Sequence, residues 1–127
     1  PAVQNAFGLV RVGLITDALT ELDTLDDTEL TGARLAVESM LAAVRLNAPS
    51  ADTINQVMIG RQLAERHAIA AVEHAMELAG GIGFYRSAGL ERKFRDIQAA
   101  RYHPLQSGPQ AEYAGALALG LPVDRVF

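Results

Sequence analysis

Histidine is the residue type in this chain best suited to acid–base chemistry near neutral pH, because the 127 residues include three histidines and no cysteine. His67 and His74 are seven residues apart, so on one helix they share a face but lie two turns from each other. A helical two-metal carboxylate site needs a glutamate three residues before each ligating histidine. Ala64 and Ala71 stand at those positions. We therefore expect no metal site, and the spacing offers no Ser-His-Asp triad.

A glycine-rich turn, Gly80-Gly81-Ile82-Gly83, is a second candidate for chemistry. One glycine is enough to end a helix, because glycine readily adopts a positive φ. Three glycines in four positions also let the backbone approach another surface closely, and exposed amides there could hold a phosphate or pyrophosphate. No strand precedes the turn, so it is not the dinucleotide-binding fingerprint. Both a helix stop and a ligand contact remain open.

Basic residues are concentrated just after this turn. Two pairs four residues apart, Glu91 with Arg95 and Arg92 with Asp96, are spaced to interact along one helix. A solvated, paired face is the simpler interpretation, and a contact surface for an anionic cofactor or a neighbouring subunit is the alternative. Five of the eleven basic residues lie here: Arg86, Arg92, Lys93, Arg95 and Arg101.

Composition limits the kinds of protein that could carry these residues. A chain of 127 residues that is 50% hydrophobic and 20% charged fits a single folded domain, residues 1–127, and excludes a disordered tail. The net charge of −4 argues against a nucleic-acid binder. No apolar run approaches a membrane span, and the first residues lack the features of a signal peptide, so we expect a cytoplasmic location. The start at Pro1 suggests a piece of a longer protein.

Apolar residues recur with helical spacing, and proline and glycine separate the segments. We find no alternating pattern of a strand, so we predict an all-α fold, an antiparallel four-helix bundle with a short fifth helix. The predicted helices are Val3–Leu22, Asp27–Leu46, Asp52–Ala79, Gly89–Tyr102 and Gln110–Leu119.

The third predicted helix is apolar on more than one side. One narrow stripe consists of alanines, whereas larger apolar residues lie elsewhere around the helix. A helix of this kind is usually buried on several faces, which suggests a partner beyond its own fold. The alanine stripe is Ala64, Ala68, Ala71, Ala75 and Ala79, and the larger residues are Ile59, Leu63, Ile69, Val72 and Met76.

The glycine turn and the basic segment together resemble a known family. The run from Ala75 to Pro104 reads AMELAGGIGFYRSAGLERKFRDIQAARYHP. It is similar to the carboxy-terminal helical domain of the acyl-CoA dehydrogenases, in which a helix ends in a Gly-Gly-x-Gly turn followed by an Arg-Asp pair. The matching residues are Gly80, Gly81, Gly83, Arg95 and Asp96. The preceding helices match in order and length, so the resemblance covers nearly the whole chain.

The resemblance implies the last domain of an FAD-dependent enzyme for acyl-CoA α,β-dehydrogenation. Two further domains would hold most of the acyl-CoA substrate and the flavin. This domain would complete the FAD site and form a dimer or tetramer, or pair with a catalytic paralogous subunit. The residues it would place against FAD are Glu77, Gly80, Gly81 and Gly83.

Three departures from the family pattern bear on activity. Glu77 stands where the family has glutamine, and the family's arginine-rich FAD-contacting segment has no match near Asp23 to Leu30. Pro104 stands at the usual place of the glutamate base, and a proline cannot remove a proton. The pattern also resembles flavin-dependent monooxygenases of the same superfamily, which have a histidine close to the flavin at this place. The neighbouring His103 could therefore abstract or relay a proton, or it could cap the fourth helix. The alternatives to a dehydrogenase are thus a monooxygenase that uses His103 and a non-catalytic assembly module.

Overall fold

The computed structural model describes residues 28–103 and 105–124, and within them every regular element is helical. The predicted all-α class is confirmed for this part of the chain. The predicted first helix, Val3–Leu22, and Pro104 lie outside the described residues. The elements are α3 (Thr28–Leu46), α4 (Ala51–Ala79), the 3₁₀ turns η1 (Gly80–Phe84) and η2 (Arg86–Ala88), α5 (Leu90–Gln98), the 3₁₀ turn η3 (Ala99–Arg101) and α6 (Ser107–Ala118).

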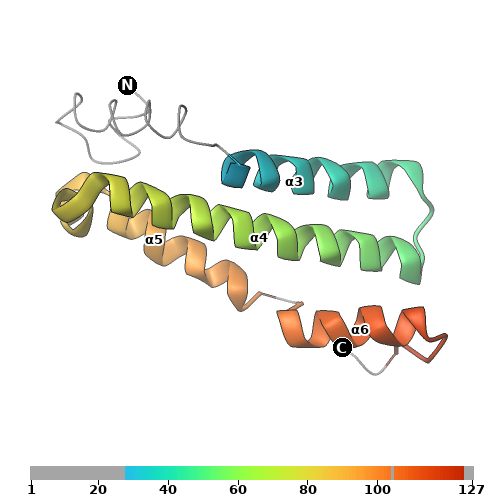
Figure 1. The fold of residues 1–127 in the computed structure, drawn as a ribbon. Helices are drawn as coiled ribbons and strands as arrows, with labels where there is room; N and C mark the ends of the chain where they lie inside the picture. Colours follow the sequence, from blue (N-terminus) through green and yellow to red (C-terminus); the bar gives the residue numbers. More distant parts are fainter. Residues whose placement is uncertain (1–27, 104, 125–127) are drawn as a thin grey trace.

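A long central helix organises the fold. The 29 residues of α4 span about 43 Å at 1.5 Å per residue. Figure 1 shows α3 on one side of this helix and α5 and α6 on the other. The last two follow each other along α4, with α5 near its carboxy-terminal half and α6 near its amino-terminal half. No helix in the described ranges is long and apolar enough to cross a membrane.

The turn between α3 and α4 is fixed by local hydrogen bonds. The Ser50 hydroxyl accepts a bond from the Thr53 amide at 3.1 Å and so caps the start of α4. The Thr53 hydroxyl donates to the Ala48 carbonyl at 2.8 Å, and the side-chain amide of Asn47 donates to the Ala43 carbonyl at 2.9 Å. These bonds satisfy groups that a helix end leaves open, and the short connection turns α4 back along α3.

Small residues let α3 and α4 approach closely. Gly60 is buried on the side of α4 that faces α3, and a Cβ at this position would stand 2.5 Å from the Met40 Cγ atom. Ala36 and Ala43 of α3 are also buried. The ring of His67 lies over Gly32, and its Nδ1 atom lies 2.6 Å from a carboxylate oxygen of Glu29 at the start of α3. These contacts hold the two helices together over most of their length.

Within the described ranges, few apolar side chains are fully buried. In α5 and α6, Leu90 and Tyr113 are buried against α4, and the Tyr113 hydroxyl donates to the Ala51 carbonyl at 3.3 Å. Many larger apolar side chains are exposed, including a stripe along α3 with spacings of three and four residues. We call Leu30, Ala33, Val37, Leu41 and Val44 the α3 stripe, and all but Ala33 are exposed. The buried apolar residues are Ala36, Ala43, Ile69, Ala71, Ala88, Leu90, Leu105 and Tyr113.

Candidate functional site

The glycine turn and the start of α5 form a groove at one end of the molecule. Its volume is about 640 Å³. Arginine, aromatic and apolar side chains line it together with one carboxylate. The lining residues, which we call the glycine-turn groove, are Met76, Phe84, Tyr85, Arg86, Glu91, Phe94 and Arg95. Of the residues singled out from the sequence, Arg86, Glu91 and Arg95 line this groove. The four residues predicted to contact FAD do not line it: Glu77, Gly80, Gly81 and Gly83.

Two of the three turn glycines are open to solvent and one is not. Gly80 ends α4 with φ +60° and ψ −143°, which confirms the predicted helix stop. Its amide donates to the carbonyls of Met76 and Glu77, so this donor is used within the helix end. Neither Gly80 nor Gly81 has an atom within 4 Å of the place of a Cβ. An approaching molecule can therefore come close to the backbone here.

Gly83 has a different environment from the first two glycines. It is buried, and a Cβ there would lie 3.3 Å from the Ala79 Cβ atom and 3.4 Å from the Leu90 Cδ2 atom. This glycine therefore lets the turn pack against the first residue of α5. Its own surroundings explain its presence without a ligand.

Some charged side chains around the groove form ion pairs with described residues, and others do not. Arg95 lies 3.3 Å and Arg92 3.5 Å from carboxylate oxygens of Asp96, and all three side chains are more than half exposed. The other pair suggested by spacing, Glu91 with Arg95, does not form among the described residues. Arg86 has no ion-pair partner in the described part of the chain. Its guanidinium is therefore the cation at the groove that is most available to an anion.

Two aromatic rings stand beside this cation. Phe84 and Tyr85 are 80% and 66% exposed, and their ring centroids are 6.4 Å apart in an edge-to-face arrangement. Exposed rings next to an arginine can stack on a planar group while the arginine pairs with its phosphate. Glu77, the fourth residue predicted to contact FAD, is exposed on the last turn of α4.

His103 lies far from the glycine turn. It follows η3, in the connection to α6, and it is exposed and makes no hydrogen bond with the described residues. This connection contacts Arg61, which precedes Gly80 by 19 residues of α4, or about 28 Å along the helix axis. The structure therefore does not bring His103 and the glycine turn into one site within this chain. It also shows α5 ending at Gln98, five residues before His103.

The connection that carries His103 is fastened to the middle of α4. Arg61 donates to the Ala100 carbonyl at 2.7 Å and to the Leu105 carbonyl at 3.1 Å. The buried Gln62 side chain also donates to the Leu105 carbonyl, at 2.8 Å. Sequence reasoning missed both residues. No local signal distinguished them, because α4 carries many other polar residues, such as Glu65 and Arg66.

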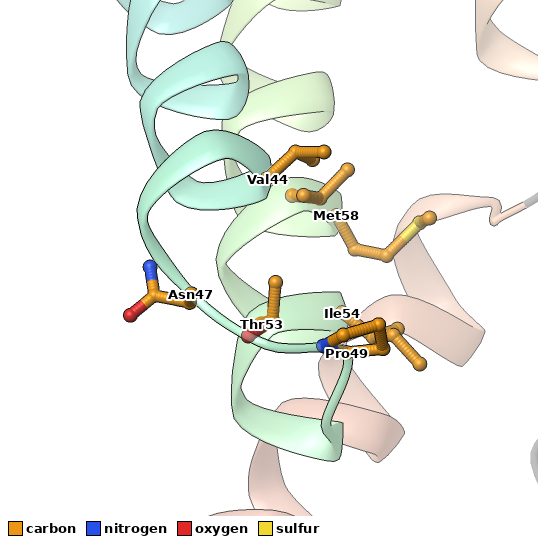
Figure 2. Close-up of a pocket in the computed structure, with 7 residues that line it drawn as sticks. Val44, Asn47, Pro49, Thr53, Ile54 and Met58 are labelled. Carbon is orange, nitrogen blue, oxygen red and sulfur yellow. The ribbon is translucent and has the colours of Figure 1, made fainter.

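A second cavity, shown in Figure 2, lies at the opposite end of α4, beside the turn from α3. Its volume is about 240 Å³ and no ionisable side chain lines it. Val44, Ile54 and Met58 lie on the same side of the helix pair, whereas Asn47 points away from them (Figure 2). The cavity offers apolar contacts and no group for proton transfer. Its lining is Val44, Asn47, Pro49, Thr53, Ile54, Val57 and Met58.

Comparison with known proteins identifies the domain. Residues 18–107 match the family described as acyl-CoA dehydrogenase, C-terminal domain. A stretch of 59 residues is 34% identical to a protein named amino sugar nitrososynthase DnmZ, from Streptomyces peucetius, and covers 46% of this chain and 15% of that protein. No solved structure matches the chain. The family match includes α3, α4, the glycine turn and α5. The chain belongs to the acyl-CoA dehydrogenase C-terminal domain family.

Proposed function

We propose that this chain is the helical domain of an FAD-dependent oxidoreductase and that its glycine-turn groove completes a flavin site. The observation that carries the proposal is that Arg86, which has no ion-pair partner among the described residues, lines the groove together with two exposed aromatic rings. The open glycines Gly80 and Gly81 belong to the turn that precedes these residues. Family membership supports the choice of cofactor. FAD, when bound, supplies two-electron redox chemistry, and the groove supplies binding and orientation.

The groove suits the chemical parts of FAD. The cofactor combines an anionic pyrophosphate with planar rings, which match the Arg86 guanidinium and the rings of Phe84 and Tyr85. Gly80 and Gly81 have no side chain to block a close approach. Glu91 also lines the groove, so Arg86 has to offset a nearby negative charge. We assign Gly83 to the packing of the turn.

The two predicted contact regions are best explained by two different flavins. Arg61, which holds the connection around His103, is about 28 Å along α4 from Gly80, the first residue of the glycine turn. In an oligomer the groove would contact the FAD of a neighbouring subunit, while His103 would approach the flavin of its own subunit. The proposal therefore includes self-association, and a pairing with a catalytic paralogous subunit is the alternative.

Dehydrogenation of an acyl-CoA is one candidate reaction, because the family is named for it. That reaction needs a base, and this chain has no carboxylate between Asp96 and Glu112. Pro104 cannot serve, so the base would be His103 or would come from outside this domain.

Oxygenation of an amine is the second candidate, and two observations favour it. A histidine, His103, stands next to Pro104, which occupies the usual place of the glutamate base, and the relative DnmZ is named as an amino sugar nitrososynthase. We therefore propose that the enzyme oxidises the nitrogen of an amine, with His103 moving a proton at the substrate. An assembly module without chemistry is the remaining alternative.

The test uses the full-length protein that contains this chain. FAD content is measured for the unmodified protein, for Arg86→Ala and for the control Lys93→Ala, an exposed residue of α5 outside the groove. We expect about one FAD per subunit, and a ten-fold or greater rise in the Kd for FAD only for Arg86→Ala. Oxygen uptake that depends on an amino sugar and a reduced nicotinamide would support the amine oxidation. Anaerobic flavin reduction by an acyl-CoA would support dehydrogenation, and a protein without FAD would contradict both.

A further inference from the structure

Two adjacent residues in the middle of α4 hold both ends of the segment that carries His103. Arg61 bonds the Ala100 carbonyl before His103 and the Leu105 carbonyl after it, at 2.7 and 3.1 Å. Gln62 adds a bond to the same Leu105 carbonyl at 2.8 Å. His103 therefore lies within a short segment whose ends are both tied to a long helix.

Burial makes this attachment well defined. Gln62 and Leu105 are only 4% and 6% exposed. The side chain of Arg61 is 19% exposed, and a carboxylate oxygen of Glu65 lies 3.6 Å from it. The ion pair restricts the guanidinium, whose planar fork allows two carbonyls to be bonded at once. A lysine at position 61 would present a single ammonium without this fixed geometry.

The polar nature of Gln62 points to a role beyond filling space. Its Oε1 atom is buried and has no hydrogen-bond partner among the described residues. A buried polar atom without a partner is unfavourable, so an apolar side chain of similar size would serve packing better. The group that uses the polar character of Gln62 is the Leu105 carbonyl, two residues after His103.

We infer that Arg61 and Gln62 are positioning residues that fix the His103 segment against α4 and thereby set where the His103 ring meets the substrate. The inference rests on the proposed role of His103 in proton movement. Displacing a group by about 1 Å can lower a reaction rate about 100-fold, because proton transfer requires hydrogen-bond geometry. Neither positioning residue needs to touch the substrate for this effect.

The experiment uses the full-length enzyme with its flavin and two conservative substitutions. Gln62→Leu keeps the side-chain volume and removes the amide that donates to the Leu105 carbonyl. Arg61→Lys keeps the positive charge and removes the planar guanidinium that bonds two carbonyls at once. Arg66→Lys is the matched control, since Arg66 is exposed on the same helix and has no ion pair in the described chain. We expect kcat to fall roughly 10- to 100-fold for the two test variants. KM and FAD content should be unchanged, and the control should match the unmodified enzyme.

A double-substitution series separates positioning from a merely structural role. If Arg61 acts through His103, Arg61→Lys should lower kcat in the unmodified enzyme and have no further effect in a His103→Ala background. Losses that multiply in the double variant would overturn the inference, as would an unchanged kcat in both Arg61→Lys and Gln62→Leu. If one variant fails to fold, the other gives the same comparison. Intact turnover in His103→Ala alone would instead overturn the proposed role of His103, and with it the positioning.

Discussion

Gly60 and Gly115 are helical glycines with opposite surroundings. Around Gly60, a Cβ would meet the Met40 side chain at 2.5 Å and the Ala36 carbonyl oxygen at 3.3 Å, whereas around Gly115 nothing lies within 4 Å. A larger residue at position 60 must push α3 away from α4, and a larger residue at position 115 meets no obstacle. The same substitution type therefore has opposite consequences at the two sites.

We predict that Gly60→Val destabilises the fold by about 1–3 kcal/mol, because overpacking in a close helix contact has this cost. Gly115→Ala should stabilise α6 by about 0.5–1 kcal/mol, since alanine is the better helix former. Chemical denaturation of the two variants measures both changes. Equal stability of Gly60→Val and the unmodified protein would show that Met40 can move aside without cost.

His103→Ala tests the proposed proton transfer directly. If this histidine moves a proton at the substrate, its loss should lower turnover of the full-length enzyme by about 10²–10⁴-fold while the FAD content stays constant. His74→Ala is the matched control, because His74 is an exposed histidine on α4. Because α5 ends at Gln98 and Tyr102 caps η3, His103 is not the cap of the fourth helix. A His103→Ala variant with full turnover and reduced thermal stability would instead indicate a structural role in the connection to α6.

The role of a residue could be predicted from the sequence where that role depends only on the residue's own backbone conformation. The stop at Gly80 followed from the backbone freedom of glycine, and its positive φ agrees. Contacts between distant residues gave no such signal. Arg61 bonds carbonyls 39 and 44 residues away, and Gly83 packs against the start of the following helix, so both depend on the finished fold.

Helix boundaries were the part of the fold most accessible from sequence. The predictions Asp27–Leu46 and Asp52–Ala79 differ from α3 and α4 by a single residue at the first end and agree at the last. Ser50 gives a strong local signal for the start of α4, and Gly80 gives one for its end. The last predicted helices were less accurate, because η3 continues α5 in tighter form and α6 begins at Ser107, three residues before the prediction. Ser107 and Pro109 are residue types that favour the start of a helix, and the prediction did not use them, whereas no residue pattern marked the change from α5 to η3.

The α3 stripe gives the predicted bundle a specific geometry. Residues 3–22 carry an apolar stripe of their own, Phe7, Val10, Leu14, Ala18 and Leu22, and only residues 23–27 connect them to α3. A connection this short favours antiparallel neighbours, so Leu14 should lie near Val37 of the α3 stripe.

Engineered cysteines test this arrangement cleanly, because the chain has no cysteine. We predict that Leu14→Cys combined with Val37→Cys forms a disulfide under mild oxidation, detected by a mobility shift that reductant reverses. Leu14→Cys with Leu35→Cys is the control, since Leu35 lies on the opposite flank of α3. Equal cross-linking of both pairs would contradict the predicted packing.

At the scale of the molecule, exposed apolar surface predicts self-association. Apart from the α3 stripe, which the predicted first helix would cover, Leu35, Leu46, Ile59 and Leu63 are at least 40% exposed. Covering several hundred Å² of such surface is worth several kcal/mol at about 25 cal/mol/Å². We predict that the 127-residue chain is a dimer or larger at tens of micromolar. Light scattering that gives the mass of one chain would contradict this.

Among the residues that the structure describes, half of the eight buried apolar residues are alanines, which bears on how stability depends on protein concentration. Alanine gives up little side-chain entropy when buried, and it also contributes little hydrophobic free energy. If the chain self-associates as predicted, the subunit gains part of its stability when another copy covers its larger exposed side chains. Unfolding and dissociation then become one transition, and the melting temperature must rise with protein concentration. Calorimetric scans at two concentrations ten-fold apart would reveal that rise, and coincident scans would show that each subunit is stable by itself.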